Sequence, residues 1–427
     1  MLTLFVHAQA VPAPSEGATN DQLLRRIEQL EQRLKEMEAR EAARMSESAP
    51  SPATANAAVT APQAAPLTMA GMNAASAHDS QDLNNPHLHI RGYADAGFFA
   101  STNTPDDPES NSHFAVGQFN LFMTSRLSPR ANVLAELVVE SDSRNSVGLD
   151  LERVLFNYSI ADSLHVSVGR YHTAIGYYNT AYHHSGWMQT AIDRPFIFNF
   201  EDDGGILPIH NVGVSLAGRI PSGGLGLHYI AEIGNGRTSR TRLDEAVQTS
   251  VDENGHKAFN LALGVHPEKW YGLQAGVSFY SDRLTPAPGT LLENPANPFP
   301  IDVAARPRID ERIFSAYAVY QNTRFEFLNE ALLLQHHLDG YRTFQTPGFY
   351  TQVSNRFGSW RPYVRFQYMN ANRYEPVFGD AGLRYGPSAG IRFDVNEFAA
   401  FKIQYDRTML RDESSRNGVG TQVAFTF

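Results

Sequence analysis

The chain has 427 residues, a formal net charge of −10 and no cysteine. The missing cysteines exclude disulfides, thiolate nucleophiles and Cys-based zinc sites, and the negative charge argues against nucleic-acid binding. No stretch of about 18 or more apolar residues occurs, which excludes a membrane-spanning helix, although charged residues make up only 19% of the chain. A membrane β-barrel and a large soluble all-β protein both have such a composition.

The first ten residues resemble the end of a secretory signal peptide. Residues 2–6 form a short apolar core, and Ala8-Gln9-Ala10 matches the small-x-small pattern of a signal-peptidase site. The positively charged n-region is missing, so we expect the true start to lie upstream, and we interpret residues 1–10 as a signal-peptide remnant. A frayed apolar N-terminus is the alternative.

Residues 21–44 are predicted to form a short coiled-coil helix. Apolar residues recur there at steps of four and three, which is typical of an a/d seam; they are Leu23, Ile27, Leu30, Leu34 and Met37. About two to three heptads are too few to hold chains together alone, so the helix would either assist trimerisation or act as a spacer toward the cell wall. Residues 45–86 are rich in Ala, Pro, Ser, Thr and Asn. They are expected to form a disordered linker, because they cannot bury enough apolar area to fold.

From His87 to Phe427 the sequence predicts repeated amphipathic strands. Runs of about eight to twelve residues alternate apolar and polar side chains, and this length crosses a bilayer at a tilt. One face of residues 399–406 carries Ala399, Phe401, Ile403 and Tyr405. Short turns such as 128–130 alternate with long connections such as 284–308. We therefore predict an all-β fold over residues 87–427, a closed antiparallel transmembrane β-barrel of about 16 strands.

The last predicted strand, residues 418–427, carries a further indication. One of its faces carries Val419, Thr421, Val423, Phe425 and Phe427. An aromatic residue at the end of such a strand resembles the assembly signal of outer-membrane barrels. The barrel-assembly machinery is therefore an expected partner through the Phe427 strand.

Two stretches carry a family resemblance, residues 91–98 (RGYADAGF) and residues 168–179 (VGRYHTAIGYYN). With the helix, the linker and the strands, they make the chain resemble Gram-negative outer-membrane porins, in particular the phosphate-selective porin O/P group and similar barrel porins. The resemblance implies a homotrimer in the cell outer membrane, with the N-terminal helix in the periplasm and a loop folded inward after residues 168–179. Phosphate-selective members use a lysine-rich lining, whereas this barrel has only Lys257, Lys269 and Lys402. We therefore do not predict phosphate selectivity for this chain.

The long segment from His172 to Asn211 is the expected pore constriction, because it is too polar and too rich in glycine for one lipid-facing strand. Aromatic residues such as Tyr177 and Tyr178 would brace it against the wall, and Arg194 lies in the same segment. An acidic side is predicted at Asp193, Glu201, Asp202 and Asp203. A basic side is predicted at Arg126, Arg170, Arg361 and Arg365. Opposed acidic and basic sides would orient polar solutes; an ordinary solvated loop is the alternative.

Other patterns favour neither metal binding nor catalysis. The pairs His183-His184 and His336-His337 are adjacent, and neighbouring strand residues point opposite ways, so neither pair is expected to chelate a metal. For the same reason His184-Ser185 does not resemble a lipase site. No cofactor motif or catalytic triad is apparent.

The predicted function is passive diffusion of small hydrophilic or ionic solutes through a water-filled lumen that an inward loop narrows. The protein would not be an enzyme, and it would contact outer-membrane lipid and lipopolysaccharide. The alternative is a plugged barrel that serves as a structural anchor or adhesin.

Overall fold

The computed structural model describes the chain from residue 87 onward. The described residues are 87–102, 112–141, 147–182, 186–201, 204–237, 250–252, 254–284, 308–340, 342–378, 381–412 and 414–427. The predicted signal remnant, coiled-coil helix and linker all lie outside these ranges. Among the described residues, no helix has the length and apolar character needed to cross a membrane.

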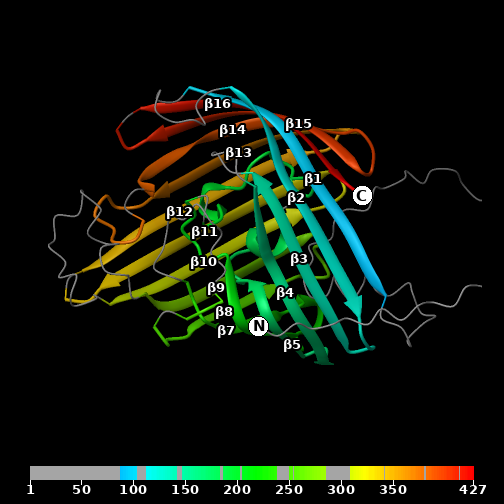
Figure 1. Cartoon of the computed structure of the whole chain (residues 1–427), viewed down its shortest axis with the longest axis vertical. Coiled ribbons are helices and arrows are strands. Elements are labelled where there is room, and N and C mark those ends of the chain that lie inside the picture. The colour runs from blue at the N-terminus through cyan, green and yellow to red at the C-terminus, as the bar shows by residue number, and fades with distance from the viewer. Residues whose placement is uncertain are drawn as a thin grey trace, which may run out of the picture. The chain divides into compact units, whose positions relative to one another are not determined.

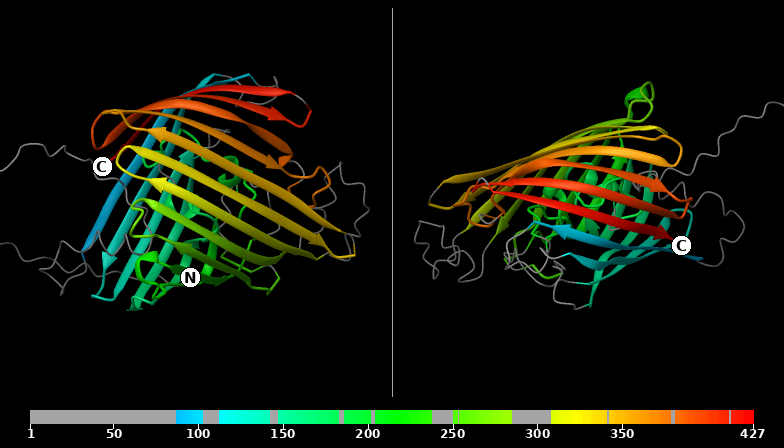
Figure 2. Two further views of the ribbon diagram at one scale, coloured as in Figure 1. Left: turned by 180° about the vertical axis from the view of Figure 1, so that it is seen from behind. Right: turned by 90° about the horizontal axis from the view of Figure 1, so that it is seen from above.

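Sixteen antiparallel strands form one closed ring in which each strand pairs with its neighbours in sequence (Figure 1, Figure 2). The strands are β1 (Leu88–Ser101), β2 (His113–Arg126), β3 (Ala131–Ser141), β4 (Val147–Ala161), β5 (Leu164–His172), β6 (His210–Arg219), β7 (His228–Gly234), β8 (Ala258–Val265), β9 (Leu273–Leu284), β10 (Ile309–Gln321), β11 (Phe325–Leu338), β12 (Thr343–Asn355), β13 (Trp360–Asn370), β14 (Leu383–Asp394), β15 (Ala399–Leu410) and β16 (Ser415–Thr426). The predicted fold class, a closed barrel of about 16 strands, is confirmed.

The ring closes where β1 pairs with β16, and the terminal Phe427 lies at this seam. The Gly92 N–H donates to the Phe427 carbonyl at 2.8 Å, and the Phe427 N–H donates to the Gly92 carbonyl at 3.0 Å. A Cβ on residue 92 would lie 2.3 Å from the Phe427 ring. Glycine at this position therefore makes room for the last aromatic side chain.

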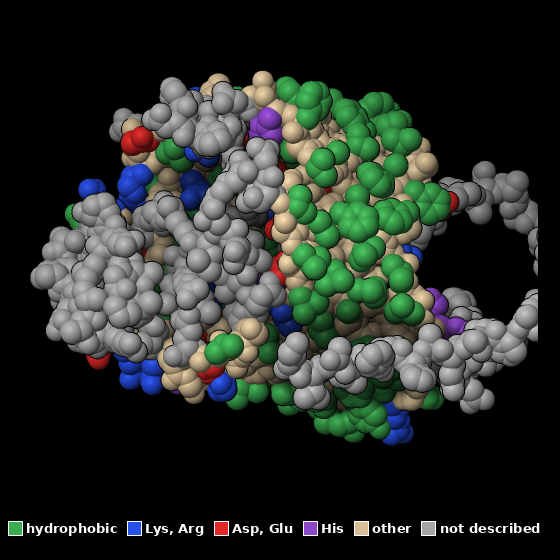
Figure 3. All heavy atoms as spheres, in the orientation of Figure 1, with side chains coloured by type: hydrophobic (Ala, Val, Ile, Leu, Met, Phe, Trp, Pro, Cys, Tyr) green, Lys and Arg blue, Asp and Glu red, His purple; other side chains and the backbone are tan. Residues whose placement is uncertain are grey.

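Large apolar side chains cover the outer surface of the strands (Figure 3). On β4 the exposed residues include Leu149, Leu151, Val154, Phe156 and Tyr158. The positions between them are buried and mostly polar, as on β4 at Asp150, Glu152 and Asn157. This two-residue alternation has apolar groups outside and polar groups inside, the reverse of a soluble barrel or sandwich.

The two ends of the barrel differ in the length of their connections. Residues 127–130, 162–163 and 322–324 are short turns at one end. Residues 173–209 and 285–308 are long connections at the other end. The predicted alternation is confirmed in part, because the second end also has the short connections 339–342 and 411–414.

Candidate functional site

The connection between β5 and β6, residues 173–209, packs against the inward side chains of several strands. We call it the β5–β6 segment. It contains the short helices α3 (Tyr178–Ala181) and η2 (Phe196–Phe198). Its buried apolar residues include Ile175, Tyr178, Ile197, Phe198, Ile206 and Leu207, which form one cluster with Tyr280, Ile313, Leu328, Leu332, Tyr350 and Met369 of the wall. The segment and the inner face of β9–β13 therefore share a hydrophobic core.

Glu330 of β11 anchors the start of this segment. Its carboxylate accepts hydrogen bonds from the backbone N–H groups of Tyr177, at 2.5 Å, and Tyr178, at 3.0 Å. The Tyr350 hydroxyl donates to the same carboxylate at 2.6 Å. The preceding Gly176 has a φ of +73°, and a Cβ there would lie 2.5 Å from a Glu330 oxygen. Both the backbone conformation and the close approach require glycine at this position.

Further wall side chains accept hydrogen bonds from backbone N–H groups along the segment. Glu232 of β7 accepts from Ala174 at 3.0 Å, and Gln404 of β15 accepts from Ile192 at 3.0 Å. Because β7 and β15 lie far apart around the ring, the segment reaches from one part of the wall to another.

Cationic wall residues hold the backbone carbonyl groups of the same segment. Arg365 donates to the Asp193 carbonyl at 2.8 Å. Arg392 donates to the Trp187 carbonyl at 2.7 Å and to the Gln189 carbonyl at 2.9 Å. The buried Lys402 donates to the Ala191 carbonyl at 2.9 Å and also to the Gly186 carbonyl. These charges are therefore engaged with the segment's backbone.

The predicted residues Arg361, Arg365, Tyr177, Tyr178 and Arg194 all lie at this contact. Arg361 donates to the Thr190 hydroxyl at 3.5 Å, and Tyr177 donates its hydroxyl hydrogen to Gln321 at 2.7 Å. Arg194 donates to the Phe198 carbonyl at 2.5 Å, and its guanidinium lies 5.1 Å from the centre of the Tyr178 ring. Burial raises the pKa of Tyr178 to about 12, so its hydroxyl remains protonated at neutral pH.

The predicted Asp193 faces a cavity between the segment and the seam strands. The cavity has a volume of about 150 Å³ and is lined by Phe99, Ile192, Asp193, Gln404, Asp406 and Gly420, among others. Gln404 donates to both Asp193, at 3.4 Å, and Asp406, at 2.9 Å. Desolvation by the surrounding barrel raises the pKa of Asp193 to about 6, although its side chain is exposed to the cavity, and the Asp406 carboxylate contributes to the increase.

The remaining predicted residues lie elsewhere. Arg126 is exposed at the short-turn end of β2, where it donates to the Ser128 carbonyl. Arg170 is buried and donates to the Glu152 carbonyl at 3.0 Å. Glu201 accepts from the His210 backbone N–H at 3.2 Å. Asp202 and Asp203, like His183 and His184, lie outside the described residues.

Sequence reasoning missed a polar network on the inner face of β2–β4. Asn120 donates to Glu136 at 2.7 Å, and Arg153 pairs with the same carboxylate at 2.6 Å. Gln118 donates to Glu140 at 2.9 Å. The alternation along these strands indicated which side chains face inward, but not that they bond to one another across strands.

Sequence reasoning also missed the connection between β13 and β14, residues 371–382. Its Glu375 pairs with the buried His336 of β11, whose other ring nitrogen lies 2.7 Å from Glu311. Its Phe378 belongs to the same hydrophobic cluster as the β5–β6 segment. The apolar residues Val377 and Phe378 inside a long polar connection are the signal that could have identified it.

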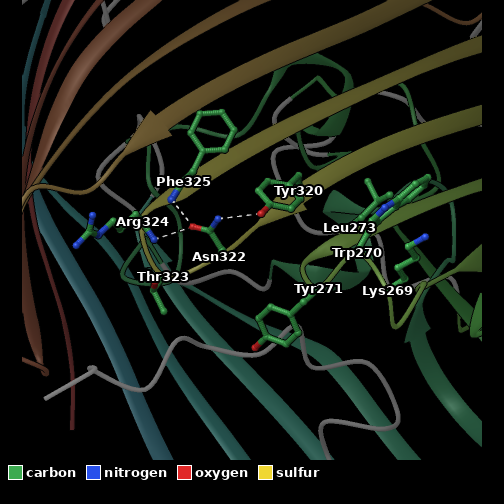
Figure 4. Close-up of a pocket in the computed structure, with 9 residues that line it drawn as sticks. All are labelled: Lys269, Trp270, Tyr271, Leu273, Tyr320, Asn322, Thr323, Arg324 and Phe325. Carbon is green, nitrogen blue, oxygen red and sulfur yellow. Dashed lines mark hydrogen bonds between the residues drawn. The ribbon is translucent and has the colours of Figure 1, made fainter. Parts of the chain in front are cut away.

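A separate hollow lies at the short-turn end of the barrel (Figure 4). It has a volume of about 740 Å³, and the residues around it come from the β8–β9 and β10–β11 turns. Exposed Trp270 and Tyr271 line it together with Tyr320 and Phe325. None of its lining residues belongs to the β5–β6 segment, so we assign the hollow to the aromatic rim of the barrel and not to the candidate site.

Comparison with solved structures relates this geometry to known barrels. The anion-selective porin from Comamonas acidovorans matches with a TM-score of 0.54 and 12% identity over 80% of this chain and 100% of that chain. The chain has a porin-like fold. The outer membrane channel DcaP of Acinetobacter baumannii matches with a TM-score of 0.54 and 10% identity, over 80% of this chain and 98% of that chain. The trimer form of OmpT, an outer membrane protein of Vibrio cholerae, matches with a TM-score of 0.50 and 8% identity, over 81% of this chain and 100% of that chain. No family model and no curated sequence matches the chain.

Proposed function

We propose that this protein is an outer-membrane channel through which small hydrophilic solutes diffuse passively. The observation that carries the proposal is the distribution of side chains: exposed apolar residues cover the outside of a closed ring, and hydrogen-bonded polar residues lie on the inner face of β2–β4. An apolar outer belt is stable in lipid, and a polar inner face is stable in water. The porin-like fold supports the same location and activity.

The β5–β6 segment is proposed to narrow the lumen. Its contacts with β7, β11 and β15 support this role, since they attach it to well-separated parts of the wall. Its apolar contacts lie on β9–β13, whereas the β2–β4 side keeps hydrogen-bonded polar side chains. Solutes would therefore pass along the inner face of β1–β5.

This passage is proposed to favour cations. Among the described charged residues of β1–β5 that are buried or half-buried, the carboxylates are Asp95, Glu136, Glu140, Asp150 and Glu152. The guanidinium groups in the same set are Arg153 and Arg170. Arg365, Arg392 and Lys402 of β13–β15 instead donate to carbonyl groups of the β5–β6 segment, so we place these side chains at the segment and not in the passage.

Planar-bilayer recordings of the purified protein test these proposals. Stepwise current increases are expected, and a salt gradient should give a reversal potential that indicates cation preference. Replacing Arg361 and Arg365 together by Gln should change the ion preference less than replacing Glu140 by Gln. The absence of current steps would contradict the proposed channel function. A preference for anions in the unaltered protein would contradict the proposed acidic passage.

A plugged barrel that serves as an anchor or adhesin is the second candidate. The observation that favours it is the hydrophobic cluster between the β5–β6 segment and β9–β13. Loosening the segment separates the two candidates, because a plugged barrel should conduct only after the segment is loosened, whereas a channel conducts before.

The assembly and finer family assignment are further proposals. The family resemblance and the trimer form of OmpT support a homotrimer, which the mass of the detergent-solubilised protein would test. Outer-membrane lipid and lipopolysaccharide are the proposed contacts of the apolar belt. Membership of the phosphate-selective group rests on residues 91–98 and 168–179 alone.

A further inference from the structure

The two ends of the β5–β6 segment meet at a pair of histidines. His172 ends β5, His210 begins β6, and the two residues are partners in the strand register. Their rings lie edge to face, with centroids 4.8 Å apart. The 37 residues between them thus leave the wall and return to it at one place.

Glu152 of β4 completes a buried group with these histidines. One of its carboxylate oxygens lies 2.5 Å from His210 Nε2. Each of the three residues offers one potential ligand atom, and these three atoms all lie within 4.8 Å of one another. All three side chains are buried. A metal bound by imidazole and carboxylate holds its ligand atoms about 3–3.5 Å apart, so small rotations of these side chains would complete a site.

The second ring nitrogen of each histidine faces an oxygen acceptor. His172 Nδ1 lies 3.0 Å from the Asn179 carbonyl, which can only accept, so this nitrogen carries the proton and Nε2 carries the lone pair. His210 Nδ1 lies 3.5 Å from the Glu201 carboxylate. Metal-binding histidines have this arrangement, in which one nitrogen faces the metal and the other donates to a carbonyl or carboxylate.

The charge around the group suits a divalent cation. Asp150 and Glu201 join Glu152 as electrostatic neighbours of His210, and Arg170 is the cationic neighbour. When both imidazoles are neutral, the carboxylates of Glu152 and Glu201 outnumber the Arg170 guanidinium, so the group is net negative and attracts a cation.

We propose that Glu152, His172 and His210 bind one divalent transition-metal ion of the Zn²⁺ class. Two imidazoles and one carboxylate favour Zn²⁺ or Co²⁺ over Mg²⁺ and Ca²⁺, which prefer all-oxygen sites. The ion would connect both ends of the β5–β6 segment to β4. Asn179 and Glu201 belong to this segment, so its folding orients the histidines. Metal binding at this group is independent of whether the barrel conducts.

Metal titration of the full-length folded protein in detergent tests the site. After treatment with chelator, ZnCl₂ is added in a calorimeter, and CoCl₂ is added in parallel while its visible absorption is recorded. One ion per chain is expected, with the absorption of nitrogen- and oxygen-bound Co²⁺. Glu152→Gln, His172→Asn and His210→Asn should each abolish stoichiometric binding, and Glu201→Gln should weaken it about 10- to 100-fold.

His337→Asn is the matched control, because His337 is exposed on β11 and should leave binding unchanged. The heat-dependent shift of gel mobility that folded barrels show, with circular dichroism, confirms that each variant is folded. The proposal is overturned if the folded unaltered protein binds neither Zn²⁺ nor Co²⁺ saturably. In that case His210 is an imidazolium held between Glu152 and Glu201. Unchanged binding in folded His172→Asn overturns it equally.

Discussion

The inner faces of β9–β13 and β2–β4 belong to one barrel but have different neighbours. On β9–β13 the inward residues, such as Leu328 and Tyr350, pack in a core with the β5–β6 segment. On β2–β4 the polar inward residues, such as Asn120 and Glu136, hydrogen bond to one another beside a small apolar cluster that contains Leu134. Both faces obey the same two-residue alternation, so alternation alone does not distinguish a wall that supports a segment from one that borders water. The inner face of β9–β13 should therefore control stability, and the inner face of β2–β4 should control ion preference.

Removing the Glu330 anchor should have the largest effect. Glu330→Ala leaves the Tyr177 and Tyr178 N–H groups and the Tyr350 hydroxyl without their acceptor in a buried place. We expect the free energy of unfolding to fall by about 2–4 kcal/mol, because each buried donor loses its partner. Urea unfolding in lipid vesicles measures this. Glu397→Ala, at an exposed turn, is the control and should change stability by less than about 0.5 kcal/mol.

Glu330→Ala also distinguishes an open channel from a plugged barrel. In a channel, a loosened segment should increase the single-channel conductance and its noise. If stability falls while conductance and noise stay unchanged, the segment does not border the passage, and the proposed contrast between the two faces would have to be abandoned.

Removing the Lys402 amino group should have the next largest effect. Lys402→Met keeps most of the side-chain volume but leaves the buried Gly186 and Ala191 carbonyls without their donor. The free energy of unfolding should fall by about 1–3 kcal/mol. The same substitution at exposed Lys269 is the matched control. Equal stabilities of the two variants, measured by urea unfolding, would show that Lys402 does not hold the segment.

Changing the polar face should affect the current and not the stability. Glu140→Gln removes one negative charge and retains an acceptor for Gln118. The free energy of unfolding should change by less than about 0.5 kcal/mol, whereas the reversal potential in a salt gradient should shift toward lower cation preference. A reversal potential equal to that of the unaltered protein would place the passage away from β3.

The barrel and the position of the long segment follow from the sequence because both depend on local patterns. Alternation indicates the strands, and the irregular polar stretch from His172 to Asn211 interrupts it. The contact of Arg365 with the Asp193 carbonyl could not be predicted from local sequence patterns, because the two residues are distant in sequence. The pairing of His172 with His210 likewise requires the strand register, which short-range periodicity does not provide.

The Asp193 carboxyl should give the smallest effect, a dependence of ion preference on pH. Desolvation by the surrounding barrel and the Asp406 carboxylate raise its pKa from 3.8 to about 6. The folded state thus favours the protonated form, so this group's contribution to stability is complete below about pH 3.8 and is lost as the pH rises through about 6. In the same interval the cavity gains a negative charge, and cation preference should increase between about pH 5 and pH 7.5.

Asp193→Asn should remove most of this increase, and Asp412→Asn, at an exposed turn, should retain it. Reversal potentials at the two pH values measure both. Arg365 is a cationic neighbour of this carboxylate and offsets part of the new charge, so the increase in cation preference should be modest. A cation preference that does not change with pH in the unaltered protein would mean that solutes cross the barrel without passing this carboxylate, and the passage would then lie on the far side of the segment from the seam strands.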